Sequence, residues 1–125
     1  MNNNASLMIL VAGPYRSGTK DDPKKIAANV QAMTDTALTI YRLGHLPVMG
    51  EWFALPLIEA AGSKHIGDAA FNEIFHPVAV QLIGHCDAVL RTGGPSSGAD
   101  EMVATGRAKG KKIFMSIDEV PKVLK

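Results

Sequence analysis

The stretch from Asp87 to Lys112 constrains the fold of this chain more than any other. An apolar run, residues 88–90, leads into the Gly/Ser-rich stretch 91–99 and then into a segment that carries Asp100 and Glu101. This pattern predicts a buried strand, a loop and a helix. In an open α/β sheet, such a loop lies at the carboxyl end of its strand, where backbone N–H groups and the helix dipole face any ligand. Carboxylates at that position indicate chemistry on a small, phosphate- or ribose-bearing substrate.

Apolar and amphipathic segments alternate along the rest of the chain. Strands are predicted at 7–11, 45–49, 86–91 and 111–116, and longer helices at 23–43, 68–85 and 97–109. A short helix is predicted at 55–61, and residues 117–125 are predicted to be a last short helix or a tail. This order predicts one domain, 1–125, with a doubly wound, mainly parallel α/β sheet of four to five strands, Rossmann- or flavodoxin-like, and helices on both faces. Residues 50–67 are expected to form a wall of the ligand pocket.

Composition narrows the classes of ligand. The net charge of +1 gives no field that would favour a nucleic acid or an anionic membrane, so a small molecule is the expected partner. A single cysteine, Cys86, and the absence of a long apolar segment predict a cytoplasmic protein. The histidines show no metal-ligand spacing and are expected at the surface or at helix caps, namely His45, His65, His76 and His85. No metal and no cofactor is therefore expected.

The loop after the first strand resembles a phosphate-binding loop without being one. Gly13 and Gly18 are five residues apart, but Thr19-Lys20 reverses the Gly-Lys-Ser/Thr order that a nucleoside triphosphatase needs. Backbone N–H groups and the planar fork of Arg16 are still suited to a phosphate or carboxylate. The alternative, that Arg16 is a solvated loop charge, stays open.

Two interpretations of the helix start at 96–101 also stay open. Ser96, Ser97 and Gly98 present donors to a phosphate or a sugar hydroxyl, and Glu101 follows them. Alternatively, Ser97 with Asp100 or Glu101 forms a capping box that only stabilises the helix.

These motifs together resemble the nucleoside 2-deoxyribosyltransferase-like superfamily, in particular a small bacterial branch of it. That branch has an Ala-Gly-Pro-Tyr start, a Gly-His-x-Pro second strand, and an Asp-Ala-Val-Leu-Arg strand that leads into Ser-x-Gly-Ala-x-x-Glu. The corresponding segments here are 12–15, 44–47, 87–91 and 96–101. The resemblance implies deoxyribosyl transfer or N-glycosidic hydrolysis on a nucleoside or a nucleoside 5′-monophosphate, with Glu101 as the nucleophile.

The resemblance also implies roles for other residues. Gly13, Arg16 and Ser96, or less readily Ser97, would hold the nucleotide, and relatives complete their pockets in homodimers or homotetramers. Tyr15 and Trp52 are candidates to stack on a base. The relatives' acid is replaced here by Pro95, so the proton donor is unassigned among Glu51, Asp87 and Asp100. A non-catalytic nucleotide or phosphate-sugar binding module is the alternative function.

Overall fold

The computed structural model describes residues 5–123 and shows a four-stranded, entirely parallel sheet. Its strands are β1 (Met8–Ala12), β2 (Leu46–Val48), β3 (Ala88–Arg91) and β4 (Lys112–Phe114), in the spatial order β2-β1-β3-β4. The helices are α1 (Pro23–Arg42), α2 (Gly50–Ala60), α3 (Ala69–His85) and α4 (Ser97–Ala108), and a 3-10 turn, η1, spans Ile117–Glu119. The predicted doubly wound parallel fold is confirmed; residues 124 and 125, the end of the predicted tail, lie outside the described residues.

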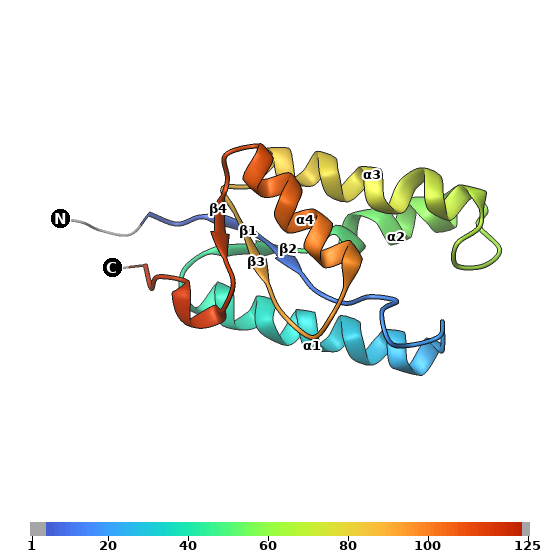
Figure 1. Ribbon diagram of the computed structural model, residues 1–125, viewed down its shortest axis with the longest axis horizontal. Coiled ribbons are helices and arrows are strands. Elements are labelled where there is room, and N and C mark those ends of the chain that lie inside the picture. The colour runs from blue at the N-terminus through green and yellow to red at the C-terminus, as the bar shows by residue number, and fades with distance from the viewer. Residues whose placement is uncertain (1–4, 124–125) are drawn as a thin grey trace.

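Each face of the sheet is covered by helices (Figure 1). Successive residues of β1 point to opposite faces, so that Ile9 and Val11 pack against α1, whereas Leu10 and Ala12 pack against α3 and α4. All four are buried. This two-sided burial explains why the strand appears in the sequence as a continuous apolar run instead of an alternating one.

The winding direction reverses between β1 and β3. The chain moves from β1 to the edge strand β2, returns across β1 through α2 and α3 to β3, and then continues outward to β4. β1 and β3 therefore lie side by side, with Ala12 opposite Arg91 at their carboxyl ends. In such sheets the ligand crevice lies beyond this point.

One prediction about a helix was wrong. The helix predicted at 55–61 begins five residues earlier, at Gly50, because α2 follows β2 directly and packs its buried side chains, Ala54 and Ile58, against Phe71 of α3. Pro56 stays inside this helix, although proline cannot donate the usual N–H bond. The helix predicted at 68–85 is confirmed, and α3 continues through Pro77.

Candidate functional site

A cavity of about 350 Å³ lies at the carboxyl end of β1. Five segments line it: the end of β1, the loop after β1, the first residues of α2, one face of α3, and the first turns of α4 with the N-cap residue before them. Its volume is typical of a small-molecule site. The predicted wall, residues 50–67, contributes only Gly50 and Glu51, whereas α3 supplies most of the opposite side.

The cavity brings together most of the residues that the sequence singled out. Those that line it are Gly13, Tyr15, Arg16, Glu51, Ser96, Ser97, Gly98 and Glu101. Two predicted residues do not line it. Trp52 lies on α2 outside the cavity lining and is 43% exposed. Asp100 instead lines a separate groove formed by α1, the end of β3 with its following loop, and the segment after β4.

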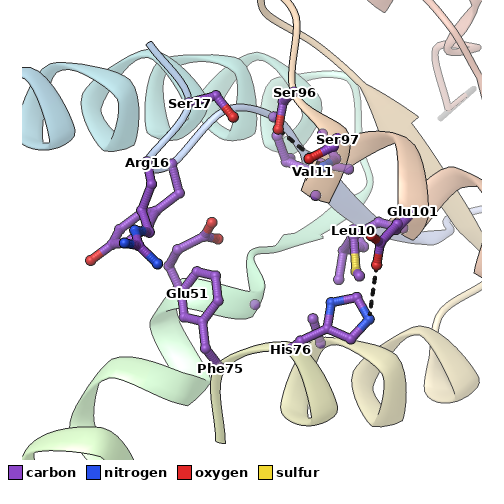
Figure 2. A pocket seen from close by; sticks show the side chains of 18 of the residues that line it. Leu10, Val11, Arg16, Ser17, Glu51, Phe75, His76, Ser96, Ser97 and Glu101 are labelled. Carbon is purple, nitrogen blue, oxygen red and sulfur yellow. Dashed lines mark hydrogen bonds and ion pairs between the residues drawn. The ribbon is translucent and has the colours of Figure 1, made fainter. Parts of the chain in front are cut away.

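Glu101 presents its carboxylate to the cavity (Figure 2). Its side chain is 63% exposed, and its Oε2 lies 3.4 Å from Nε2 of His76 on α3. Within residues 5–123, Oε1 of Glu101 makes no hydrogen bond or ion pair. Glu101 is therefore an accessible carboxylate with one oxygen oriented by a neighbouring imidazole.

His76 is the residue that sequence reasoning missed. The histidines were expected at surface or capping positions because no metal-ligand spacing connects them. The useful signal lies in three dimensions: α3 and α4 pack on the same sheet face, and this packing brings positions 76 and 101 together. No sequence spacing within either helix contains that information.

The glutamate of the family pattern and Glu101 of this chain differ by one residue in their distance from the preceding serine. Counted from Ser96, the pattern Ser-x-Gly-Ala-x-x-Glu places its glutamate at position 102, which is Met102 here. Met102 also lines the cavity, but it is buried in the core between the sheet and the helices. Glu101 thus supplies a carboxylate to the same cavity from the adjacent helical position.

Ser96 is the N-cap of α4. Its Oγ accepts the N–H of Ala99 at 3.1 Å, and its own carbonyl accepts the N–H of Asp100. Ser96 is buried, while Ser97 and Gly98 are exposed at the cavity. The capping box predicted for Ser97 is therefore wrong, because the helix begins at Ser97 itself and Ser96 caps it. The donors that remain available to a ligand lie at Ser97 and Gly98.

Asp100 turns away from the cavity because it pairs with Arg91. The side chain of Arg91 is only 10% exposed, and its Nε donates to Oδ1 of Asp100 at 3.0 Å. The remaining guanidinium nitrogens donate to the carbonyls of Thr92 and Gly94. This clamp holds the loop after β3 and the first turn of α4 in one arrangement.

An aromatic wall lines the side of the cavity next to α3. The rings of Tyr15 and Phe75 lie 4.9 Å apart, and Phe75 stacks on Phe71 at 4.7 Å. Burial, followed by the nearby Glu51 carboxyl, raises the pKa of the Tyr15 hydroxyl. The phenol therefore stays protonated at neutral pH and can both donate and accept a hydrogen bond.

Glu51 is the proton-donor candidate that the fold places in the cavity. Burial raises the pKa of its carboxyl above the ordinary value of 4.5. The other two candidates have structural partners, since Asp100 pairs with Arg91 and Asp87 accepts the N–H of Met8 at 2.8 Å. A carboxyl with a raised pKa is better suited than an ordinary one to donate a proton to a leaving group.

The side chain of Arg16 lines the cavity and forms an ion pair with Asp21. Its Nε and Nη2 each lie 2.9 Å from a carboxylate oxygen of Asp21, and its guanidinium lies over the ring of Phe71 at 5.7 Å. The hydrogen bond with Asp21 raises the pKa of Arg16 and lowers that of Asp21. The Arg16 side chain is 41% exposed, so the alternative of a solvated loop charge stays open, with the exposed Asp21 as its partner.

Two further residues have structural roles. His45 is buried and accepts the N–H of Leu7 at Nδ1, which places its proton on Nε2, where it donates to the Pro121 carbonyl. Burial raises the pKa of the Cys86 thiol to about 11, so this sulfur is unreactive at neutral pH. Within residues 5–123, no three His, Cys, Asp or Glu side chains are grouped as a metal site requires.

Comparisons with known proteins leave the family open. No family model matches the sequence, and no curated protein matches it. Within the described part of the chain, every helix is too short or too polar to cross a bilayer. The activity must therefore be inferred from the cavity and the motifs that form it.

Proposed function

We propose that this protein cleaves or transfers the N-glycosidic bond of a nucleoside or a nucleoside 5′-monophosphate, with Glu101 as the nucleophile. The observation that carries the proposal is an accessible carboxylate at the switch point of the sheet, facing an aromatic wall across a cavity of about 350 Å³. The wall formed by Tyr15 and Phe75 suits a base, and Ser97 and Gly98 suit sugar hydroxyls. The motifs shared with the deoxyribosyltransferase-like superfamily favour the same chemistry.

In the first step, Oε1 of Glu101 attacks C1′ of the sugar while the bond from C1′ to the base nitrogen breaks. The bonding electrons leave with the base, and Glu51 donates the proton that neutralises it. His76 holds Oε2 of Glu101 and thereby directs the other oxygen at the sugar. The product is a glycosyl ester, formed through a transition state with oxocarbenium character.

In the second step, water or a second base attacks C1′ from the face that the first base has left. The ester bond breaks, the electron pair returns to Glu101, and the proton of the attacking group passes to the Glu51 carboxylate. Two inversions give net retention at C1′. Every group then returns to its starting state.

The direct test is to incubate the protein with a panel of nucleosides and 5′-monophosphates and to measure free base by chromatography. Glu101→Gln preserves size and removes the carboxylate, so base release should fall at least about 100-fold. Glu73→Gln on the exposed side of α3 is a matched control. Base release that survives in Glu101→Gln would remove Glu101 from the mechanism.

A non-catalytic binding module is the second candidate, and Met102 is the observation that favours it. An apolar side chain occupies the position where the resemblance places its glutamate. Binding of a nucleoside without release of its base would support this function. Met102→Glu sharpens the test, since base release that appears only in this variant would show that the natural chain lacks the nucleophile.

We also propose, from the resemblance, that the chain works as a homodimer or homotetramer. Trp52, Phe53 and Leu57 on α2 are between 43% and 52% exposed, which is apolar surface that a second copy would cover. Light scattering should give a mass of two or four chains, and Trp52→Ser with Leu57→Ser should reduce it. A monomeric natural protein would contradict this part of the proposal.

A further inference from the structure

A buried histidine, His45, precedes the second strand, and the proposed chemistry does not use it. His45 belongs to the Gly-His-x-Pro motif, 44–47, and only 2% of its surface is exposed. A buried imidazole needs a hydrogen-bond partner at each ring nitrogen. Here both partners are backbone groups that come from distant parts of the chain.

The two ring nitrogens of His45 join three segments. Nδ1 accepts the N–H of Leu7, just before β1, at 3.0 Å, and Nε2 lies 2.6 Å from the carbonyl oxygen of Pro121, after η1. Beside the ring, the Ser6 hydroxyl donates to the Gly44 carbonyl at 2.9 Å. The chain before β1 and the chain after η1 come to the same side of the molecule (Figure 1). His45 therefore links the first described residues, the turn before β2 and the last described residues.

The C-terminal segment, 117–123, closes over one side of the core. Val120 is buried in the hydrophobic cluster between the sheet and α1. The N–H of Val123 donates to the Leu43 carbonyl at 2.8 Å. A Cβ added to Gly44 would lie 2.6 Å from Cβ of Val123, so the segment packs directly on this glycine. Its backbone is thus fastened to the turn between α1 and β2, the turn that carries the histidine.

The hydrogen bonds of His45 require the neutral imidazole. The N–H of Leu7 can only donate, so Nδ1 must be unprotonated, and the Pro121 carbonyl can only accept, so Nε2 carries the proton. A second proton would attach to Nδ1 and face the N–H of Leu7, one donor against another. The buried N–H of Leu7 would then lose its acceptor, which is costly.

The charged groups around the ring do not compensate a second proton. The segments that meet at or beside His45 carry the charged side chains Arg42, Asp87, Asp118, Glu119 and Lys122. Asp87 accepts the N–H of Met8 at 2.8 Å, and Glu119 accepts the N–H of Met115 at 2.9 Å. Within residues 5–123, no acidic side chain forms an ion pair with His45. An imidazolium at this buried position would therefore have no counter-ion among the described side chains.

We propose that His45 is a pH-sensitive latch: the neutral imidazole holds the C-terminal segment, 117–123, closed, and acid releases it. Histidine ordinarily changes its charge between about pH 5 and pH 8. In the open form the imidazole is in water and takes up the second proton that the closed form excludes, so a fall in pH favours opening. Opening uncovers Val120 and the core side chains beneath it. The latch is independent of the proposed activity, because His45 is not among the groups of that mechanism.

The test is hydrogen exchange of single backbone amides, followed by NMR on the natural protein at about pH 7.5 and about pH 5 and corrected for the intrinsic exchange rates. A histidine in water has a pKa of about 6.5, so the opening equilibrium reported by the amides of Val123 and Leu7 should be at least about 10-fold larger at the lower pH. The N–H of Thr92, which donates to the Ala12 carbonyl at the other end of β1, is the internal reference. Its opening should not rise to the same extent.

His45→Asn supplies a neutral side chain that keeps an acceptor for Leu7, and it should abolish the rise in opening at low pH. His65→Gln removes an exposed histidine and is the matched control, which should keep the rise. If His45→Asn does not fold, His45→Gln takes its place, and NMR of the ring nitrogens in the natural protein at about pH 7.5 should show the proton on Nε2.

A rise that is present in the natural protein and lost in the His45 variant would support the latch. Four results would overturn it: no rise at Val123, a rise that persists in the His45 variant, an equal rise at Thr92, which means general loosening in acid, or a ring proton on Nδ1.

Discussion

Two neighbouring loops lie at the carboxyl edge of the sheet, and they are held by different means. The loop after β1 is closed by an exposed ion pair between Arg16 and Asp21, with side chains 41% and 46% exposed. The loop after β3 is closed by Arg91, which is nearly buried and donates to two loop carbonyls as well as to Asp100. Exposed ion pairs contribute little to stability, whereas buried charge-assisted hydrogen bonds contribute more. The loop after β3 is therefore held more firmly than the loop after β1.

The two loops also contact each other directly. A Cβ added to Gly93 would lie 2.5 Å from Cδ of Pro14, and Gly93 has a φ of +80°. A Cβ at Gly13 would likewise lie 3.1 Å from the Thr92 carbonyl oxygen. The loop after β1 thus packs directly against the more firmly held loop after β3.

The largest expected effect comes from Gly93→Ala, which breaks this contact. The new methyl group would overlap Pro14 and would require an unfavourable φ, so the free energy of unfolding should fall by about 2–3 kcal/mol. Urea denaturation measures it. Gly94→Ala is the matched control, since no atom lies within 4 Å of its added Cβ and the change should stay within about 0.5 kcal/mol. Equal effects at both glycines would contradict the contact between the loops.

The next largest effect is the difference in stability loss between substitutions of the two arginines. Arg91→Met should lower the free energy of unfolding by about 1–3 kcal/mol, because it leaves the carbonyls of Thr92 and Gly94 without their donors. Arg16→Met should cost less than about 1 kcal/mol, because its pair with Asp21 is exposed. Thermal and urea unfolding of the two variants, measured side by side, would show which substitution costs more unfolding free energy. A larger loss in Arg16→Met would reverse the assignment of rigidity to the β3 loop.

A smaller, pH-dependent effect is expected at Glu51, which lies in the first turn of α2 and lines the cavity. Burial raises the pKa of its carboxyl in the folded state above the ordinary 4.5, so the folded protein binds this proton more strongly than the unfolded chain does. The stability due to this proton is complete below about pH 4.5 and is lost as pH rises through the raised pKa. Glu51→Gln does not titrate there. Its free energy of unfolding relative to the natural protein should rise by less than about 1 kcal/mol between pH 4 and pH 7.

A constant difference between Glu51→Gln and the natural protein over this range would show that Glu51 is not desolvated. The matched control is Glu59→Gln, because Glu59 is exposed on the same helix. Its difference from the natural protein should not follow the same rise with pH.

The smallest effect on stability is expected for Asp21→Asn. The pair that it breaks is exposed, and exposed ion pairs contribute little to stability, so the midpoint of urea unfolding should coincide with that of the natural protein. Urea denaturation of the two proteins side by side measures this midpoint. A clear loss of stability would make Asp21 a structural residue of the loop after β1.

Sequence patterns predicted the sheet well and the helix boundaries less well. The helix from Pro23 was predictable because its apolar residues recur on one face and Asp22 caps it, as observed. The start of α2 was not, because Met49 provides no side-chain cap and Pro56 interrupts the pattern, so the helix depends on packing against α3. Candidate site residues that follow a strand were predicted to lie close together, because parallel strands end at one edge of the sheet. His76 lies within a helix, so this rule does not apply to it.

By itself, the sequence determined that this is a parallel α/β domain, and it predicted that the loop after β1 and the start of α4, with Glu101, would meet at one edge of the sheet. These features follow from local apolar patterns and from the general rule that parallel strands end at one edge. The tertiary structure decided which of the charged residues face the cavity. It turned Asp100 toward Arg91, placed His76 beside Glu101, and paired Arg16 with Asp21. The physical reason is that the partner of a charge depends on the packing of helices and loops in space, and no periodicity along the chain records it.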